Sequence, residues 1–377
     1  MSDVHSSLDW LVTEITSLRD GPMYRRRREV LPLPDGRCEV EGRELLNFAS
    51  NDYLNLAQDP RVIDAAQKAL LLGTGARASA LVCGRTPFHV ELEETIAAFE
   101  GTEDAVVFPT GYAANVGALR ALIRPEDVIF CDRFNHASLL DGCRLSQARL
   151  RVYRPDDLSV LERELSAPIP EGSRRWIVTD SVFSMDGWLA PLSEICTLAE
   201  AHDAAVFVDE AHGTGVFGEL GRGVCELTQT TDRVAVRVGT LSKAVGALGG
   251  FVAGSRDLCE WLWNHARTQM FSTALPPSVC AAASTALHAL MLEPQRRTRL
   301  HELCALLRSE LKAAGIEVQP QSQGPIIPIV MGEPERTLKL AQQLEERGYL
   351  VAAIRPPTVP NGTSKPAPCW RHSSAKR

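Results

Sequence analysis

The chain has 377 residues, of which 45% are hydrophobic and 23% charged, and its formal net charge at pH 7 is −7. A chain of this length can bury a large core and is expected to divide into one large domain and smaller units. The negative charge argues against attraction to nucleic acid or to an anionic membrane. No apolar run approaches the roughly 20 residues that span a bilayer.

The first expected element is a helix over residues 8–19. It is followed by four consecutive arginines, Arg25 to Arg28, which in an acidic chain are more often a solvated turn or a local anion contact than a nucleic-acid site. Residues 39–48 are typical of a hairpin with its turn at Gly42. Residues 1–48 are therefore expected to form an N-terminal segment. The helix has one apolar face, expected to pack against the main domain: Leu8, Leu11, Val12, Ile15 and Leu18.

Between about residues 61 and 251, helical stretches alternate with short apolar runs. This alternation is typical of a mainly parallel sheet covered on both faces by helices. Residues 49–285 are therefore expected to form the large domain. The expected strands are residues 105–108, 128–130, 176–179, 206–208 and 234–238.

A smaller α+β unit is expected after the large domain. A helical stretch rich in alanine and leucine follows residue 273 and reaches residue 291. The remaining pattern predicts an amphipathic helix over residues 296–314, a strand over 326–330 and a further helix over 337–347. Residues 286–377 are therefore expected to form a small C-terminal domain.

Two of the apolar runs deliver reactive side chains to their carboxyl ends. Asp209 and His212 follow one run, and Lys243 follows the next. The carboxyl ends of parallel strands are where α/β folds bind ligands. The two residues are 243 − 209 = 34 positions apart, about the length of one strand-crossover-strand unit, so the carboxylate and the amine can face one cavity.

This pair suits pyridoxal 5'-phosphate. A lysine amine forms a Schiff base with the cofactor aldehyde, and a carboxylate at the pyridine nitrogen keeps that nitrogen protonated. An isolated aspartate more often caps a helix, and an isolated lysine is usually solvated. The occurrence of both after apolar strands, together with His212 and glycine-rich turns, favours the cofactor site. No metal ion is implied.

Six motifs along the chain resemble those of the α-oxoamine synthases, which are fold-type I enzymes that depend on pyridoxal phosphate. The resemblance extends from about residue 8 to residue 362. It implies a mainly parallel seven-stranded sheet covered by helices in the large domain, and a small α+β domain after it. The motifs lie at residues 51–54, 110–115, 132–138, 181–187 and 209–213 and at Lys243.

The resemblance implies four catalytic residues. Lys243 would bind the cofactor aldehyde and later move the α-proton of the substrate, while Asp209 would pair with the ring nitrogen. His136 would stack on one face of the ring, where an imidazole offers planar contact. His212 would hydrogen-bond near the phenolic oxygen of the cofactor or the substrate carbonyl.

Further cofactor contacts are implied in the same way. Ser184 would act beside His212, and Thr240 would bind the phosphate. Gly111 and Tyr112 open a helix whose free backbone amides suit a phosphate dianion.

A homodimer with shared active sites is implied as well. In members of the family, the Ser-Thr pair that matches Ser272 and Thr273 reaches the phosphate of the neighbouring subunit. Without the resemblance, these two residues would be taken for a helix cap.

The family joins an amino acid to an acyl thioester and releases carbon dioxide. Residues 353–360, with the sequence AIRPPTVP, are similar to the segment typical of the 8-amino-7-oxononanoate synthases, the biotin-pathway branch. In that branch, L-alanine reacts with pimeloyl-CoA or with its carrier-protein equivalent. Arg355 would grip the amino acid carboxylate through two hydrogen bonds. Arg25 and Asn51 align with substrate-contacting positions, although the arginine run leaves the register of Arg25 open by one residue.

The carboxyl end departs from the family pattern. After residue 363 the family usually continues with an arginine-flanked apolar strand and a last helix, whereas residues 364–372 read SKPAPCWRH. Two prolines and no periodicity argue against a central strand or a helix. The small domain is therefore expected to lack an edge strand and its covering helix, as in a truncated or frame-altered product, with apolar surface exposed and stability lowered.

Two alternative functions remain at this point. One is a sister enzyme that uses glycine or serine with another acyl-CoA, which the two prolines after Arg355 disfavour. The other is a non-catalytic partner or pseudoenzyme, suggested only by the altered tail. The ten cysteines are scattered without a Cys-x-x-Cys pair, and no leader-like segment precedes them, so reduced thiols in the cytoplasm are expected.

Overall fold

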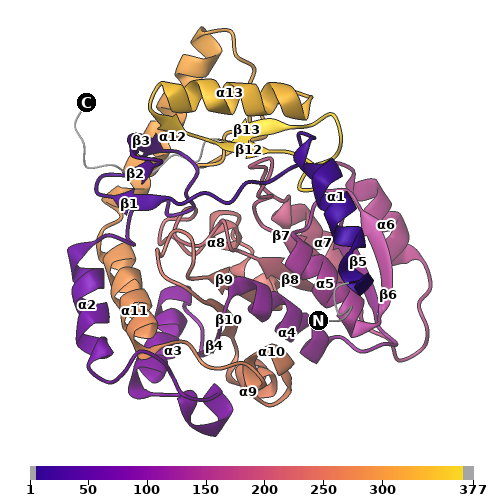
Figure 1. Cartoon of the computed structure of the whole chain (residues 1–377). Helices are drawn as coiled ribbons and strands as arrows, with labels where there is room; N and C mark the ends of the chain where they lie inside the picture. The colour runs from indigo at the N-terminus through magenta and orange to yellow at the C-terminus, as the bar shows by residue number, and fades with distance from the viewer. Residues whose placement is uncertain (1–5, 368–377) are drawn as a thin grey trace.

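The computed structural model describes residues 6–367. A seven-stranded sheet forms the centre of the large domain, with the strand order β4-β10-β9-β8-β7-β5-β6 (Figure 1). Strand β10 runs antiparallel to both of its neighbours, whereas the pairs from β9 to β6 are parallel. The predicted fold class is confirmed. The strands are β4 (Asp104–Phe108), β5 (Val128–Asp132), β6 (Arg149–Tyr153), β7 (Arg175–Asp180), β8 (Ala204–Asp209), β9 (Val236–Thr240) and β10 (Gly250–Gly254).

Helices cover both faces of this sheet because alternate strand residues face opposite sides. Ile177 of β7 lies in the core cluster shared with α3, α6, α7 and α11, whereas Val178 lies in the cluster shared with α4, α5 and α9. The longer helices of the domain are α2 (Pro60–Leu70), α3 (Pro87–Glu100), α4 (Gly111–Leu122), α5 (Ala137–Ser146), α6 (Leu158–Ser166), α7 (Leu192–Ala201), α9 (Arg256–His265) and α11 (Pro277–Leu292). Short helical turns are α8 (Val224–Leu227), α10 (Arg267–Met270), Ser6–Leu8, Ala80–Gly84 and Thr231–Arg233.

The N-terminal hairpin forms as predicted and joins a distant part of the chain. Strands β1 (Leu31–Leu33), β2 (Arg37–Val40) and β3 (Arg43–Asn47) are antiparallel, and Gly42 at the turn has a φ of 76°. Strand β11 (Tyr349–Leu350) then pairs in parallel with β3. Arg28 donates to both carboxylate oxygens of Glu345, at 2.7 and 2.9 Å. The arginine run thus makes a local anion contact within the chain.

The C-terminal unit contains α12 (Gln295–Ala313), α13 (Pro334–Glu346) and a two-stranded sheet of β12 (Ala352–Ile354) and β13 (Lys365–Ala367). The helices predicted in this region are confirmed. Helix α11 continues across residue 285, where the sequence pattern placed the end of the large domain.

Two predictions for the C-terminal unit are wrong. Residues 326–330 form no regular strand although Ile327 is fully buried, because Pro325 and Pro328 lack the amide hydrogens of a ladder. Instead, the amide of Ile329 donates to the carbonyl of Pro366. Conversely, a strand does form after residue 364, since β13 pairs antiparallel with β12. The rest of the expected tail, residues 368–377, lies outside the described residues.

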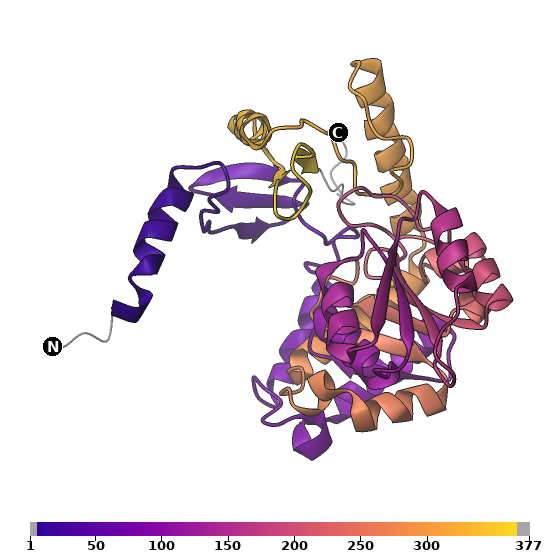
Figure 2. The same ribbon diagram turned by 90° about the vertical axis from the view of Figure 1, so that its right-hand side faces the viewer.

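Helix α1 (Trp10–Arg19) is present, but its expected packing is wrong. It has no buried residue, and Val12 is 69% exposed. Figure 2 shows α1 standing away from the large domain at the end of the N-terminal segment. The apolar periodicity therefore predicts the helix correctly. Within residues 6–367 of a single chain, however, no other segment covers the apolar face of α1.

Within residues 6–367, no helix combines the length and the apolarity needed to cross a membrane. The nine cysteines in this range are free thiols.

Candidate active site

A cavity of about 250 Å³ lies where β8 and β9 end and α4 begins. This is the edge of the sheet at which α/β folds bind ligands. The sequence predicted eight of the residues that line it: Gly111, Tyr112, His136, Ser184, Asp209, His212, Thr240 and Lys243. Six others were not predicted: Thr110, Asn115, Ser138, Asp180, Ala211 and Ser242.

Lys243 brings an amine into this cavity directly after β9. Burial lowers the pKa of Lys243, and the nearby carboxylates of Asp209 and Asp180 oppose this shift. A lowered pKa leaves more of the amine neutral, which is the form that attacks an aldehyde.

Asp209 is the last residue of β8, and both of its carboxylate oxygens are held. Oδ1 accepts the amide of Ala211 at 2.7 Å, and Oδ2 accepts Nδ2 of Asn115 at 2.6 Å. The side chain is thus fixed with only 4% exposure. Asn115 was missed as a site residue although it lies in the motif at residues 110–115, because the motif alone does not show which side chain turns inward.

His136 is the N-cap of α5, and its ring nitrogen Nδ1 accepts the amide of Ser138 at 3.2 Å. Its backbone amide donates to Oδ2 of Asp180 at 2.6 Å. Burial lowers the pKa of His136, so the imidazole is neutral near pH 7. Burial, and next the charge of Asp209, raise the pKa of Asp180 well above its usual value. Asp180 ends β7, and its position at a strand end was the signal that could have revealed it.

The start of α4 forms an anion-binding corner. Thr110 caps the helix by accepting the amide of Ala113 at 3.0 Å, and the amides of Gly111 and Tyr112 before it have no carbonyl partner within the helix. A Cβ at Gly111 would lie 3.1 Å from Oγ1 of Thr240, so glycine lets β9 approach the helix start closely. The hydroxyl of Thr240 donates to the carbonyl of Gly249 at 2.9 Å, and Ser242 lies beside it.

His212 is a buried residue of the cavity lining. Its Nδ1 is 2.8 Å from the hydroxyl of Tyr53, which is fully buried and was not predicted as a site residue. Burial lowers the pKa of His212 well below its usual value, and the charge of Lys243 adds to this effect. His212 is therefore neutral and fixed by its neighbour.

The three predicted substrate contacts do not line the cavity. Asn51 is exposed, with Oδ1 at 3.4 Å from the hydroxyl of Tyr53. The guanidinium of Arg355 donates to the carbonyls of Pro22, Tyr24 and Ala353, at 2.8, 2.7 and 3.2 Å. Arg25 donates to the carbonyl of Pro356 at 3.0 Å. The two arginines thus fasten the N-terminal segment to the C-terminal unit.

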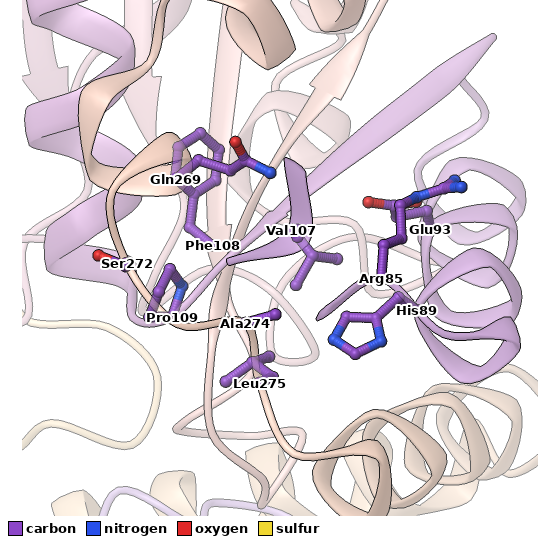
Figure 3. Close-up of a pocket in the computed structure, with 11 residues that line it drawn as sticks. Arg85, His89, Glu93, Val107, Phe108, Pro109, Gln269, Ser272, Ala274 and Leu275 are labelled. Carbon is purple, nitrogen blue, oxygen red and sulfur yellow. The ribbon is translucent and has the colours of Figure 1, made fainter. Parts of the chain in front are cut away.

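Ser272 and Thr273 also lie outside this cavity. Thr273 is exposed and forms an antiparallel bridge with Ser79. Ser272 lines a second, much smaller cavity of about 10 Å³ beside Pro109 (Figure 3). That volume suits one water molecule. Gln269 is 3% exposed there, and neither end of its amide has a hydrogen-bond partner among the described residues.

The donor set of the larger cavity fits pyridoxal phosphate. The cavity presents a desolvated amine, a fixed carboxylate and a neutral imidazole, and a helix start with adjacent hydroxyl groups for a phosphate.

Comparison with known proteins gives a consistent result. The model of the family "Aminotransferase class I and II" matches residues 43–369. The 8-amino-7-oxononanoate synthase of Anaeromyxobacter dehalogenans (strain 2CP-1 / ATCC BAA-258) is 46% identical over 95% of this chain and 90% of its own length. The 8-amino-7-oxononanoate synthase 2 of Bacillus subtilis (strain 168) is 44% identical over 94% of this chain and 91% of its own.

Solved structures show the same fold. The serine palmitoyltransferase of Sphingomonas wittichii superposes with a TM-score of 0.92 and 33% identity, covering 99% of this chain and 95% of its own. An 8-amino-7-oxononanoate synthase from Francisella tularensis superposes with a TM-score of 0.74 and 28% identity, covering 87% and 92%. The serine palmitoyltransferase from S. paucimobilis has been solved with a bound aldimine of pyridoxal phosphate and myriocin.

Proposed function

Because the chain belongs to the aminotransferase class I and II family, and within it to the 8-amino-7-oxononanoate synthases, we propose that it joins L-alanine to a pimeloyl thioester. The products are 8-amino-7-oxononanoate, carbon dioxide and the free thiol, either CoA or a carrier protein, in biotin synthesis. The observation that carries this proposal is the convergence of Lys243, Asp209 and His136 on one cavity beside a helix start. The enzyme depends on pyridoxal phosphate.

Bound at Lys243, the cofactor supplies a ring that withdraws electrons from the α-carbon of the amino acid. Asp209, fixed by two hydrogen bonds, holds the proton on the ring nitrogen. The amides of Gly111 and Tyr112, together with Thr240, hold the phosphate. To donate to the phosphate, the hydroxyl of Thr240 would have to give up its hydrogen bond to the carbonyl of Gly249.

Four side chains act nearest the substrate. The amine of Lys243 would accept the α-proton of the substrate, and its lowered pKa leaves more of the amine in the neutral form that can act as a base. The imidazole of His136 packs against the ring and excludes water from one face. His212 and Ser184 orient the oxygen atoms at the reacting centre.

Arg355 is proposed to bind the carboxylate of alanine, with Arg25 and Asn51 nearby. This role requires the guanidinium of Arg355 to exchange the carbonyls of Pro22 and Tyr24 for the substrate. A bidentate carboxylate is a stronger partner for a guanidinium than neutral carbonyl oxygens are.

A homodimer with shared active sites is part of the proposal. Thr273 is exposed, and so are the apolar side chains of Phe271, two residues before it, and of Val82, three residues after its bridge partner Ser79, at 70% and 76%. An exposed apolar patch of this kind is typical of a protein interface. It supports a role for Ser272 and Thr273 at the phosphate of the partner subunit.

The division into an N-terminal segment (1–48), a large domain (49–285) and a C-terminal unit (286–377) is retained as a proposal. The parallel pairing of β3 with β11 couples the first and last of these parts. A cytoplasmic location is also proposed, on the ground of the free cysteines.

A sister activity is the second candidate. The serine palmitoyltransferase of Sphingomonas wittichii has the higher TM-score of the two structures compared, 0.92 against 0.74. Sequence identity points the other way, at 46% for the 8-amino-7-oxononanoate synthase against 33% for the palmitoyltransferase. A difference of one methyl or hydroxyl group between amino acids is decided by a few local contacts rather than by the fold.

One assay separates these candidates from a pseudoenzyme. The purified protein is incubated with alanine, glycine or serine, each with pimeloyl-CoA, pimeloyl-carrier protein or palmitoyl-CoA, and thiol release and product mass are followed. The proposal expects product from alanine with a pimeloyl thioester. Product only from serine or glycine would establish the sister activity. A normal cofactor spectrum with no product from any pair would establish a pseudoenzyme.

A further inference from the structure

We propose that Asn115 and Ser138 are positioning residues that join Asp209 and His136 into one hydrogen-bonded unit and place the imidazole proton on Nε2. The proposal concerns the side chains that surround the cofactor, so its relevance to catalysis rests on the proposed function. Neither Asn115 nor Ser138 was expected to be a site residue.

The unit consists of four side chains from three elements. Nδ2 of Asn115, on α4, lies 2.6 Å from Oδ2 of Asp209 at the end of β8. The same nitrogen lies 2.9 Å from Oγ of Ser138 on α5. Oγ of Ser138 lies 2.7 Å from Nδ1 of His136. Asn115 and Ser138 are 2% and 0% exposed, so water does not compete for these bonds.

The directions of the bonds follow from the chemistry of the groups. An amide nitrogen only donates, so Asn115 uses its two hydrogens for the carboxylate of Asp209 and the hydroxyl oxygen of Ser138. Ser138 therefore accepts on one side and has its own hydrogen left for Nδ1 of His136. The backbone amide of Ser138 points a second donor at the same nitrogen, at 3.2 Å.

Two donors directed at Nδ1 leave no place for a proton on that nitrogen. The neutral imidazole of His136 then carries its hydrogen on Nε2. Protonation of Nδ1 as well would place a third hydrogen opposite the two donors, which is unfavourable. Within residues 6–367, the hydrogen bonds of the His136 ring all involve Nδ1. The Nε2 hydrogen therefore remains free for a ligand in the cavity.

The same chain of bonds fixes Asp209. Asn115 donates to Oδ2, the oxygen that the backbone amide of Ala211 does not reach, so both carboxylate oxygens of Asp209 are held. Oδ1 of Asn115 is buried and has no hydrogen-bond partner among the described residues, which indicates that the amide is oriented for its two donor contacts at the expense of its acceptor. Asn115 thus positions the carboxylate of Asp209, which would face the ring nitrogen of the cofactor. Ser138 positions the imidazole of His136, which would stack on the face of the cofactor ring.

The test uses Asn115→Leu, which keeps the branched shape and the number of side-chain heavy atoms and removes both donors, with Asn115→Ala as a second, smaller variant if the first does not fold. Ser138→Ala removes the hydroxyl group that links Nδ2 of Asn115 to Nδ1 of His136. Ser284→Ala is the matched control, because Ser284 is 2% exposed and loses a similar buried hydrogen bond, to Thr95 at 2.9 Å, and neither residue lines the cavity.

The first readout is the tautomer of His136, from two-bond proton–nitrogen correlation spectra of cofactor-free protein labelled at histidine nitrogen. The His136→Asn spectrum identifies the resonance. The proposal expects the Nε2–H form in the wild type and in Ser284→Ala, and a mixture with the Nδ1–H form in Ser138→Ala. This readout does not depend on the cofactor, so its failure is distinct from a failure of the proposed function.

The second readout is the dissociation constant of pyridoxal phosphate. Asn115→Leu is expected to raise it about tenfold or more, since a hydrogen bond to a charged group is lost, while Ser284→Ala leaves it unchanged. A purely structural role would lower thermal stability in all three variants without moving either readout. An Nδ1–H ring in the wild type, or variants with unchanged tautomer and unchanged cofactor affinity, would overturn the proposal.

Discussion

The hydroxyl of Tyr53 lies 2.8 Å from Nδ1 of His212, and the tyrosine is fully buried. Tyr53 precedes α2, whereas His212 follows β8, so this contact fixes a cavity side chain from a distant part of the chain. We expect Tyr53→Phe to lower kcat/KM about two- to tenfold, the effect of one lost hydrogen bond of about 0.5–1.5 kcal/mol. Steady-state kinetics would measure this, with Tyr153→Phe, a buried tyrosine outside the cavity, as control. Unchanged kinetics in Tyr53→Phe would show that the contact has no role in turnover.

The pH dependence of cofactor attachment reports on Lys243. Burial lowers the pKa of this amine below its usual value of 10.5, against the opposing charges of Asp209 and Asp180. The protonated amine does not attack an aldehyde, so the attachment rate is expected to rise with pH and to reach half its maximum below pH 10.5. Rapid mixing of cofactor-free protein with pyridoxal phosphate, followed by absorbance, gives this profile. A midpoint at 10.5 or above would contradict the desolvated site.

Lys365 and Asp186 form an ion pair, and substituting either partner is expected to lower the free energy of unfolding by a different amount. The lysine side chain, on β13, is 3% exposed, and the aspartate side chain, in the loop that carries Ser184, is 25% exposed. Asp186→Asn leaves a buried cation unpaired and is expected to lower the free energy of unfolding by about 3 kcal/mol. Lys365→Met leaves a carboxylate that water reaches, so its cost is expected to be smaller, about 1 kcal/mol.

Thermal unfolding of both variants and of the double variant tests this order. The double variant should be more stable than Asp186→Asn alone, because the unpaired cation is gone. If Lys365→Met were the more damaging change, the lysine would be stabilising β13 through packing rather than through its charge.

Asp59 predicts a loss of stability in acid. The side chain caps α2 by accepting the amide of Arg61 at 3.0 Å, and it also accepts Nη2 of Arg296 at 2.8 Å. The hydrogen bond to the Arg61 side chain is the main cause that lowers the pKa of Asp59 from 3.8 to about 2. A lowered folded-state pKa contributes stability that is present above about pH 4 and is lost as the pH falls towards 2.

Asp59→Asn measures that contribution. Because the Arg61 side chain is 52% exposed, solvent screening limits the expected loss to about 1 kcal/mol at pH 7. The difference in melting temperature between the variant and the wild type should narrow from pH 4 downward. A difference that is constant from pH 7 to pH 3 would assign the effect to the helix cap alone.

Arg355→Ala separates two roles of one guanidinium. Its hydrogen bonds to Pro22 and Tyr24 fasten the N-terminal segment, so limited proteolysis near residues 20–28 should become faster. If Arg355 also binds the amino acid carboxylate, KM for alanine should rise at least tenfold, the cost of a charge-assisted pair. Faster proteolysis with an unchanged KM would leave Arg355 a structural role only.

The large domain was predictable because each buried parallel strand is a short apolar run. All five expected strands form, and the carboxylate of Asp209 and the amine of Lys243 meet in one cavity as the strand spacing predicts. Strand β6 was not predicted because it is the last strand of the sheet and Arg149, Leu150 and Val152 on it are exposed. Its pattern therefore lacks a continuous apolar run.

Contacts between distant segments were not predictable from local pattern. The pairing of β3 with β11 involves only two residues of the later strand, and nothing in either segment specifies the other. Tyr53 and Asn115 were missed for the same reason. Each lies in one of the six family motifs, but only the fold shows that Tyr53 reaches His212 and that Asn115 reaches Asp209. Long polar side chains such as Arg355 have many available partners, so their sequence context does not select one.

The identity of the cofactor lysine tests the whole account most directly. Protein loaded with pyridoxal phosphate is reduced with borohydride, digested and mapped by mass spectrometry, with Lys243→Arg as control. The account predicts one reduced cofactor per chain, attached to Lys243, and none in the control. A label on any other lysine, or no label in the wild type, would contradict it.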